Sequence, residues 1–384
     1  MNNDIKKYTT SKGKTRYKFL IYVGKDETTG NNIQIKKQGY KTEQKALESY
    51  LKFRLKVLKG EYVPVTKRKL RLKDLYKMWV KLYKKTVQES TFVSTEKIFK
   101  NHILKDLGNI YLNKLTVSQC QNAVNTWADV APKTFKRFVF YASKLINYGI
   151  TMELMKKNPM KKVILPKIER DNKKFDNFYS KDELNTFLND AKGYNFRYFM
   201  FFRLLAYSGM RKGECLALKW SDIDFENNTI DINKSLASGE NNRLYLSPCK
   251  TSNSVRTLDM DVETMHYLKE WRTKQQKEML KLGLNFLSND NLVFANSEGN
   301  YTVLSKPQRW DNAICKKFGL RHIKVHGFRH THASLLFDVA GVSMKDVKER
   351  LGHSDITTTM NIYTHVTENK AKETANSFAK FMES

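Results

Sequence analysis

The chain has 384 residues, of which 40 % are hydrophobic and 12 % aromatic, a globular composition that excludes a disordered or collagen-like chain. Its length predicts two or three domains. The formal net charge is +30, and residues 1–175 hold 40 Lys and Arg against 14 Asp and Glu. A basic front portion of this kind is typical of a protein that binds a polyanion, so nucleic acid is the leading expectation.

Cysteine usage and hydropathy indicate the compartment. The four cysteines lie far apart without a CxxC pair, which favours packing residues in a reducing interior over disulfides. The N-terminal segment is polar, and the most apolar stretch, residues 196–207, is interrupted by Arg197 and Arg203. The sequence therefore predicts a soluble cytoplasmic protein with no membrane partner.

The first sixty residues predict a small sheet backed by one helix. β-Forming residues fill 15–23 and 32–38 around a turn, residues 5–9 could add a third strand, and 42–59 has helical spacing of apolar residues.

Three lysines, Lys18, Lys36 and Lys37, lie on or beside the predicted strands. A β-ribbon that enters a DNA groove would use such residues. A solvated basic sheet face is the alternative reading.

The rest of the chain alternates between helical and mixed character. From Leu70 onward helical spacing dominates, with Pro132 expected at a helix start and Asn158-Pro159 closing the block. Ser180 with Glu183 predicts a capping box at the start of another helix. Strands are expected at residues 229–233, 243–247 and 255–259.

Four short motifs in the rear half carry the functional signal. They are SGMRKGE with Arg211 after a glycine turn, CKTSNS with Lys250 in a turn, HGFR with His326 and Arg329, and LGH with His353, followed ten residues later by Tyr363. Each alone is most often structural. In this order and spacing they resemble the tyrosine recombinases, or integrase family, and the resemblance covers the full chain.

The resemblance implies a role for each of these side chains in breaking a phosphodiester. Tyr363 would be the nucleophile, Arg211 and Arg329 would bind the non-bridging oxygens, and Lys250 would be the general acid. His326 would assist proton transfer at the nucleophile, His353 would donate a hydrogen bond to the phosphate, and Glu214 would orient Arg211. Lys234 and Arg256 lie near Lys250 in the sequence and leave that assignment the least secure.

No cofactor or metal is expected. The sequence has no P-loop, no carboxylate cluster of a two-metal nuclease and no dinucleotide fingerprint. A phosphotyrosine intermediate conserves the bond energy that a ligase would take from a nucleotide. His326 and His330 have the i,i+4 spacing of a zinc pair, but Arg329 would place a cation beside the metal.

The resemblance implies a multidomain, mainly α protein. A three-stranded sheet plus helix at 1–62 would bind arm-type DNA sites, a helical SAM-like domain at 68–165 would bind core sites, and 172–384 would form a mostly α catalytic domain with a small antiparallel sheet. This organisation resembles the lambda-type integrases of temperate phages and conjugative transposons.

The implied activity is integration and excision of a mobile element or prophage through a 3′-phosphotyrosine and a Holliday junction. The implied partners are double-stranded DNA, three further copies of the chain in a tetramer, an excisionase and a host DNA-bending protein, in the cytoplasm of a bacterial host and on its nucleoid. The tail from Thr367 to Ser384 has one apolar helical face, which would dock on a neighbouring copy in preference to its own domain. A catalytically idle DNA-binding regulator and a type IB topoisomerase-like enzyme are the alternatives.

Overall fold

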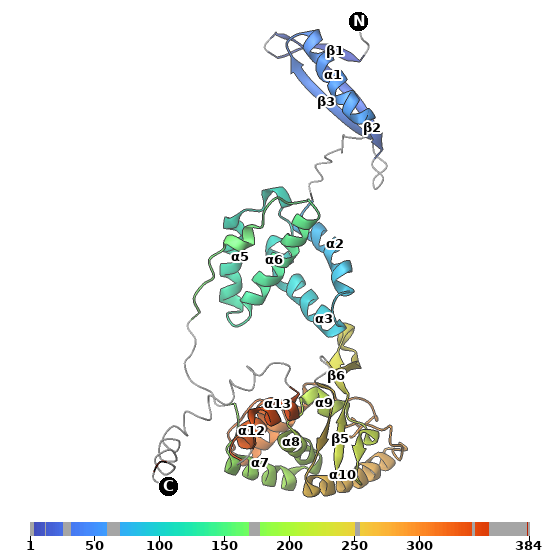
Figure 1. The fold of residues 1–384 in the computed structure, drawn as a ribbon, viewed down its shortest axis with the longest axis vertical. Coiled ribbons are helices and arrows are strands. Elements are labelled where there is room, and N and C mark those ends of the chain that lie inside the picture. The colour runs from blue at the N-terminus through green and yellow to red at the C-terminus, as the bar shows by residue number, and fades with distance from the viewer. Residues whose placement is uncertain are drawn as a thin grey trace. The chain divides into compact units, whose positions relative to one another are not determined.

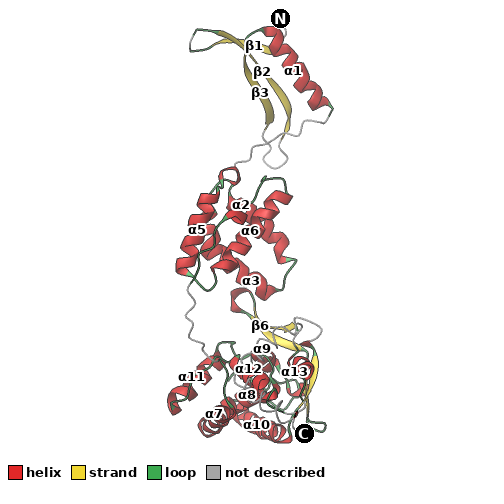
Figure 2. Ribbon diagram, turned by 60° about the vertical axis from the view of Figure 1, so that its left-hand side comes forward, coloured by secondary structure: helices red, strands yellow, loops and turns green. Residues whose placement is uncertain are grey.

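The computed structural model describes residues 4–11, 13–25, 32–59, 70–168, 177–249, 254–339, 342–352 and 382 (Figures 1 and 2). The chain divides into two compact units, and each is described here by itself. One comprises Met1–Trp79, Ile103–Trp127 and Phe135–Ile164, and the other comprises Val80–His102, Ala128–Thr134 and Leu165–Ser384. The predicted borders 1–62, 68–165 and 172–384 stay a prediction.

The first elements form an antiparallel sheet with one helix on it, as the sequence predicts. The strands β1 (Ile5–Thr9), β2 (Thr15–Lys25) and β3 (Asn32–Tyr40) lie in that order, and α1 (Glu43–Leu58) follows. Thr42 caps α1 by accepting a hydrogen bond from the Lys45 amide at 3.3 Å. A small core joins the two layers and comprises Phe19, Ile21, Ile35, Ala46 and Tyr50.

Helices dominate the next hundred residues. They are α2 (Leu72–Lys84), α3 (Glu89–Ile98), the π-helix η1 (Phe99–Ile103), α4 (Leu104–Leu107), the 3-10 helix η2 (Leu112–Lys114), α5 (Val117–Val130), α6 (Phe135–Thr151) and the 3-10 helix η3 (Pro159–Lys162). Pro132 lies in a turn three residues before α6, so its predicted place at the helix start is wrong. Asn158 closes the block as predicted, because its side chain caps η3 and bonds Ser143 and Asn147 of α6.

The rear part is mostly α with two small sheets. Its helices are α7 (Lys181–Tyr194), α8 (Phe196–Ser208), α9 (Lys212–Ala217), the 3-10 helices η4 (Trp220–Asp222) and η5 (Glu240–Asn242), α10 (Val262–Lys281), α11 (Lys306–Phe318), α12 (Gly327–Leu336) and α13 (Met344–Leu351). The strands β4 (Ile223–Asp224), β5 (Thr229–Ile232) and β8 (Arg256–Asp259) form one antiparallel sheet, and β6 (Lys234–Ser238) pairs with β7 (Leu244–Pro248).

Helix α8 is the centre of this part and packs against α7, α10, α11 and α12 (Figure 1). Its side chains are buried on every face from Phe199 to Ala206, which explains why its sequence is apolar without helical periodicity. The predicted capping box is present at the start of α7, where Ser180 and Glu183 bond each other's backbone amides. No helix within the described ranges combines the length and the apolar character needed to cross a membrane.

Candidate active site

Two arginines from distant segments meet at the carboxyl end of α13. Arg211 is the N-cap of α9, and its Nη2 donates to the carbonyl of Gly352 at 3.2 Å. Arg329 lies in α12 and donates from Nη2 to the Leu351 carbonyl and from Nη1 to the Gly209 carbonyl, both at 2.7 Å. The structure therefore brings together two of the predicted phosphate-binding residues, which we call the arginine pair.

The two members of the arginine pair differ in exposure. The Arg211 side chain is 38 % exposed, whereas Arg329 is buried at 2 %. Burial, with a smaller lowering by Arg211 that Glu214 opposes, brings the pKa of Arg329 down to about 9. This value leaves Arg329 a cation at neutral pH.

Glu214 holds the Arg211 side chain in place through hydrogen bonds. Its carboxylate accepts from the Arg211 guanidinium at 2.7 Å and from the Arg211 backbone amide at 2.9 Å. Arg256 of β8 donates to the same carboxylate at 3.1 Å. Burial alone would raise the pKa of Glu214, but Arg256 and Arg211 outweigh burial and hold that pKa below its usual value. Glu214 therefore stays ionised, and it binds both the guanidinium and the backbone amide of Arg211.

His326 is the residue before α12 and lies one helical turn before Arg329. Desolvation by the surrounding protein, together with His330, Arg329 and Arg211, lowers the pKa of His326 to about 4. The imidazole is therefore neutral at pH 7 and can accept a proton. Its ring meets the ring of His330 edge-on, with centroids 4.8 Å apart.

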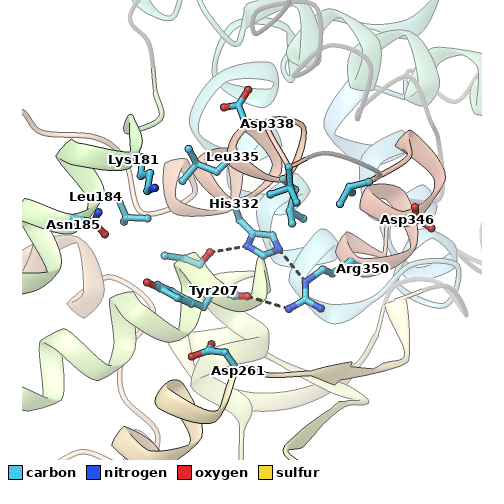
Figure 3. Close-up of a pocket in the computed structure, with 14 residues that line it drawn as sticks. Lys181, Leu184, Asn185, Tyr207, Asp261, His332, Leu335, Asp338, Asp346 and Arg350 are labelled. Carbon is cyan, nitrogen blue, oxygen red and sulfur yellow. Dashed lines mark hydrogen bonds between the residues drawn. The ribbon is translucent and has the colours of Figure 1, made fainter.

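A further histidine and a further arginine, His332 and Arg350, are bonded to each other beside a cavity, and neither is among the predicted site residues (Figure 3). His332 Nδ1 lies 2.7 Å from the Ala206 carbonyl, and its Nε2 accepts from Arg350 Nε at 3.2 Å. Arg350 also donates to the carbonyls of Tyr207 and Asp259. The two side chains line a cavity of about 720 Å³ between α7, α8, α12 and α13. Their sequence signal is the HTHA segment and the arginine before LGH.

Lys234 and Arg256, the two alternatives to Lys250 as general acid, each form an ion pair with a carboxylate. The Lys234 ammonium forms an ion pair with Asp222 at 2.6 Å, and the Arg256 guanidinium is bound to Glu214. Lys250, His353 and Tyr363 lie outside the described residues, as does the tail from Thr367 apart from Met382. The structure thus brings together Arg211, Glu214, His326 and Arg329 from the predicted set. Among the described residues no three His, Cys, Asp or Glu side chains form a group able to hold a metal ion.

The predicted DNA-binding lysines of the front sheet do not share one face. Lys18 pairs with Gln38 and lies on the face away from α1, and Lys36, opposite Leu20, lies on that same face. Lys37 pairs with the buried Phe19, and its ammonium lies 5.1 Å from the centre of the Phe53 ring of α1. The first two lysines therefore belong to one surface, and Lys37 belongs to the other.

Comparison with protein families agrees with this arrangement. Residues 177–370 match the model of the phage integrase family, and residues 71–128 match the model of the phage integrase N-terminal SAM-like domain. The chain belongs to the phage integrase family. The two matches cover the first part of the helical block and the part that holds the arginine pair.

Curated relatives in this family include recombinases and integrases of mobile elements. The chain is 31 % identical to a tyrosine recombinase XerC-like protein of Caldanaerobacter subterraneus over 380 residues, which covers 92 % of this chain and 93 % of that protein. It is 29 % identical to the ICEBs1 integrase of Bacillus subtilis over 246 residues, or 64 % of each protein.

Solved structures of integrases share the fold. The Tn1549 transposon integrase in complex with a circular intermediate DNA matches with a TM-score of 0.67 and 20 % identity, over 80 % of this chain and 99 % of that one. A lambda integrase tetramer bound to a Holliday junction matches with a TM-score of 0.55 and 16 % identity, over 94 % of both chains. These likenesses confirm the expected multidomain, mainly α fold with small antiparallel sheets.

Proposed function

We propose that the protein is a tyrosine site-specific recombinase that cleaves and rejoins DNA through a 3′-phosphotyrosine and a Holliday junction, and so integrates and excises a mobile element. The observation that carries the proposal is the arginine pair, whose members donate to the carbonyls of Leu351 and Gly352, directly before His353. Membership of the phage integrase family supports the same activity.

The arginine pair supplies the charge that phosphoryl transfer needs. A guanidinium has five N–H donors in a planar fork that matches two phosphate oxygens. The hydrogen bonds of Arg329 to the Gly209 and Leu351 carbonyls occupy two donors and leave others for a phosphate. Fixed cations of this kind stabilise the charge that develops on the non-bridging oxygens in the transition state.

Tyr363, His326 and Lys250 complete the reaction in our proposal. The phenol oxygen of Tyr363 bonds to phosphorus while the bond from phosphorus to the 5′-oxygen breaks. The neutral imidazole of His326 accepts the phenol proton, and the ammonium of Lys250 gives a proton to the departing 5′-oxygen. Rejoining runs these steps in reverse with a 5′-hydroxyl as nucleophile, so no cofactor is consumed.

The assignment of Lys250 as general acid is supported by the ion pairs that Lys234 and Arg256 form. Lys234 is paired with Asp222, and Arg256 is held by Glu214. Neither is free to follow a leaving group, whereas the long flexible stem of a lysine would let Lys250 do so. His353 would donate a hydrogen bond to the same phosphate.

The test is formation of a covalent protein–DNA adduct on the DNA that flanks the coding region, with a nick placed so that the cleaved fragment diffuses away. The wild-type chain should give an adduct on denaturing gels. Tyr363→Phe should bind the same DNA equally well in a gel shift and give no adduct, whereas Tyr194→Phe at an exposed tyrosine should behave as wild type. An adduct from Tyr363→Phe would overturn the nucleophile, and none from wild type would overturn the function.

The three predicted domains divide DNA binding in this proposal. Residues 1–62 bind arm-type sites through the sheet face of Lys18 and Lys36, residues 68–165 bind core-type sites, and residues 172–384 cut them. The outer sheet face is suited to a groove, because the strand pairing puts Lys6 beside Lys18 and Tyr8 beside Arg16 on it.

Assembly follows from the need to exchange strands between two duplexes. Four copies act on two duplexes, as in the lambda integrase tetramer bound to a Holliday junction. An excisionase and a host DNA-bending protein set direction, and the complex works on the nucleoid in a bacterial cytoplasm.

A further inference from the structure

Arg256 is a buried arginine whose guanidinium is used entirely inside the protein. Its side chain is 8 % exposed. Nε donates to the Arg350 carbonyl at 2.8 Å, Nη1 to the Ser254 carbonyl at 3.0 Å, and Nη2 to the Glu214 carboxylate at 3.1 Å. All three guanidinium nitrogens of Arg256 therefore donate to acceptors of the protein itself.

One of these bonds leads to the arginine pair through Glu214. The carboxylate that receives Arg256 also receives the guanidinium and the backbone amide of Arg211. Glu214 is buried, and a buried carboxylate between two guanidinium groups keeps its position only while both cations are present. Loss of Arg256 would leave one side of the carboxylate open and let Glu214 and Arg211 shift together.

The other bond leads to the arginine pair through α13. The carbonyls of Arg350, Leu351 and Gly352 are consecutive, and they accept from Arg256, Arg329 and Arg211. The last carbonyls of a helix have no partner within the helix and carry its partial negative charge. Three guanidinium groups satisfy them here, so the end of α13 and the arginine pair fix each other.

Side-chain hydrogen bonds of Arg350 also hold this end of α13 (Figure 3). Arg350 reaches His332 of α12, the Tyr207 carbonyl at the end of α8 and the Asp259 carbonyl at the end of β8. Its own carbonyl accepts from Arg256. Hydrogen bonds thus join the end of α13 to α8, α12 and β8. Of the residues that make these bonds, Arg256 also binds Glu214.

We propose that Arg256 is a positioning residue for the phosphate, which holds Arg211 in place through Glu214 and through the end of α13 without touching DNA. This inference rests on the proposed recombinase function. A lysine cannot replace Arg256, because one ammonium on a flexible stem does not reach the three separate acceptors that the guanidinium fork reaches.

The experiment compares adduct formation on two nicked DNA substrates, one with the natural scissile phosphate and one with a methylphosphonate. The methylphosphonate lacks one charged non-bridging oxygen, so it depends less on the arginine that would bind that oxygen. Arg256→Ala should bind DNA with nearly wild-type affinity and form adduct about 100-fold more slowly on the phosphate. On the methylphosphonate both Arg256→Ala and Arg211→Ala should lose much less.

Arg203→Ala is the matched control. Arg203 is equally buried, with a side chain 7 % exposed, and is bound to Asp261, Glu263 and Thr264, away from the arginine pair. Any effect of Arg203→Ala on cleavage should therefore be the same on both substrates. Arg256→Lys keeps the charge and most of the volume, and it replaces Arg256→Ala if that variant does not fold.

The outcomes separate the two proposals. A wild-type chain that forms no adduct on the phosphate overturns the recombinase function. A wild-type chain that forms adduct, with an Arg256 variant whose loss is equal on both substrates, overturns the positioning role, because a general structural defect does not respond to the charge of the phosphate.

Discussion

Gly209 contacts Arg329 of the arginine pair and lies close to the buried His332. It ends α8 with a φ of +65°, and its carbonyl accepts from Arg329 at 2.7 Å. A Cβ at this position would lie 2.5 Å from His332 Cδ2 and 2.7 Å from Leu351 Cδ2. Gly209 is thus required both for its backbone conformation and for the close approach of α12 and α13.

Gly209→Ala should therefore lower the free energy of unfolding, measured in urea, by about 1–3 kcal/mol. The variant should also form adduct more slowly, because Leu351 must move. Gly319→Ala is the control. Gly319 ends α11 with a φ of +68°, but nothing lies within 4 Å of an added Cβ. Gly319→Ala should cost only about 1 kcal/mol and should not slow adduct formation. If both variants lose the same free energy of unfolding and the same rate of adduct formation, then only the backbone conformation of Gly209 matters.

His332 makes folding depend on pH. Burial lowers the pKa of His332 to about 3, with Arg350 adding to the effect, whereas the ordinary value is 6.5. The folded chain therefore holds a neutral imidazole, while the unfolded chain takes up a proton as pH falls through 6.5. Its contribution to stability is complete above pH 6.5 and is lost progressively down to about pH 3.

His332→Gln should flatten this dependence, because glutamine has no titrating group but can still accept from Arg350. Below pH 6.5 the free energy of unfolding of wild type should fall more steeply than that of His332→Gln, by up to about 1.4 kcal/mol per pH unit. Urea unfolding of both chains from neutral pH to about pH 4.5 measures the difference. Parallel curves would mean that His332 is not neutral in the folded chain.

At the scale of elements, the two faces of the front sheet differ in their surroundings. Lys36 lies on the face away from α1, whereas Lys37 packs over Phe53. Lys36→Gln should lower the salt slope of arm-site binding by about 0.9 if it removes one phosphate contact. Lys37→Gln, its neighbour with the same charge, should leave the slope unchanged and lower stability by about 0.5–1 kcal/mol through loss of the cation–π contact. Binding titrations over a range of salt test both, and equal slopes for the two variants would contradict the assignment of faces.

The elements of the front part could be predicted because their signals are local. The three strands and α1 lie within a residue or two of their expected ends, since alternation, turn residues and a capping threonine are read from neighbours in sequence. Strand β6 was missed, because KSLAS has little β-forming character and forms a strand through its pairing with β7. The two faces of β3 follow from the period of two, which places Lys37 with Ile35, yet the three lysines were predicted as one set.

The residues of the candidate site also divide into those with a local sequence signal and those without one. Arg211, His326 and Arg329 stand in short motifs, and the capping geometry of Glu214 is set by a spacing of three residues. The links of Arg256 to Glu214 and to the end of α13 join segments far apart in the chain, and no local pattern encodes them. The groups proposed to react can therefore be predicted from the sequence, whereas the groups that hold them in place emerge only from the packing of α8, α12 and α13.

At the scale of the whole molecule, the charge asymmetry predicts what the front residues contribute. The part that holds the arginine pair lies beyond residue 175, where the sequence is nearly neutral, and the basic excess lies before it. Phosphate contacts supply most of the sequence-independent affinity for DNA. Residues 1–175 should therefore account for most of the DNA affinity of the chain, whereas the residues after 175 should carry out the cleavage that we propose.

Removal of residues 1–62 should separate these contributions. The shortened chain keeps the two segments matched by family models, 71–128 and 177–370, so it should still form adduct on a nicked core site. Integration between full attachment sites should fall sharply, because the sheet that carries Lys18 and Lys36 is gone. Adduct gels on the core site and an integration assay on supercoiled DNA measure the two activities. Unchanged integration would remove the arm-binding role of the sheet, and loss of core cleavage as well would place residues 1–62 in the cutting step.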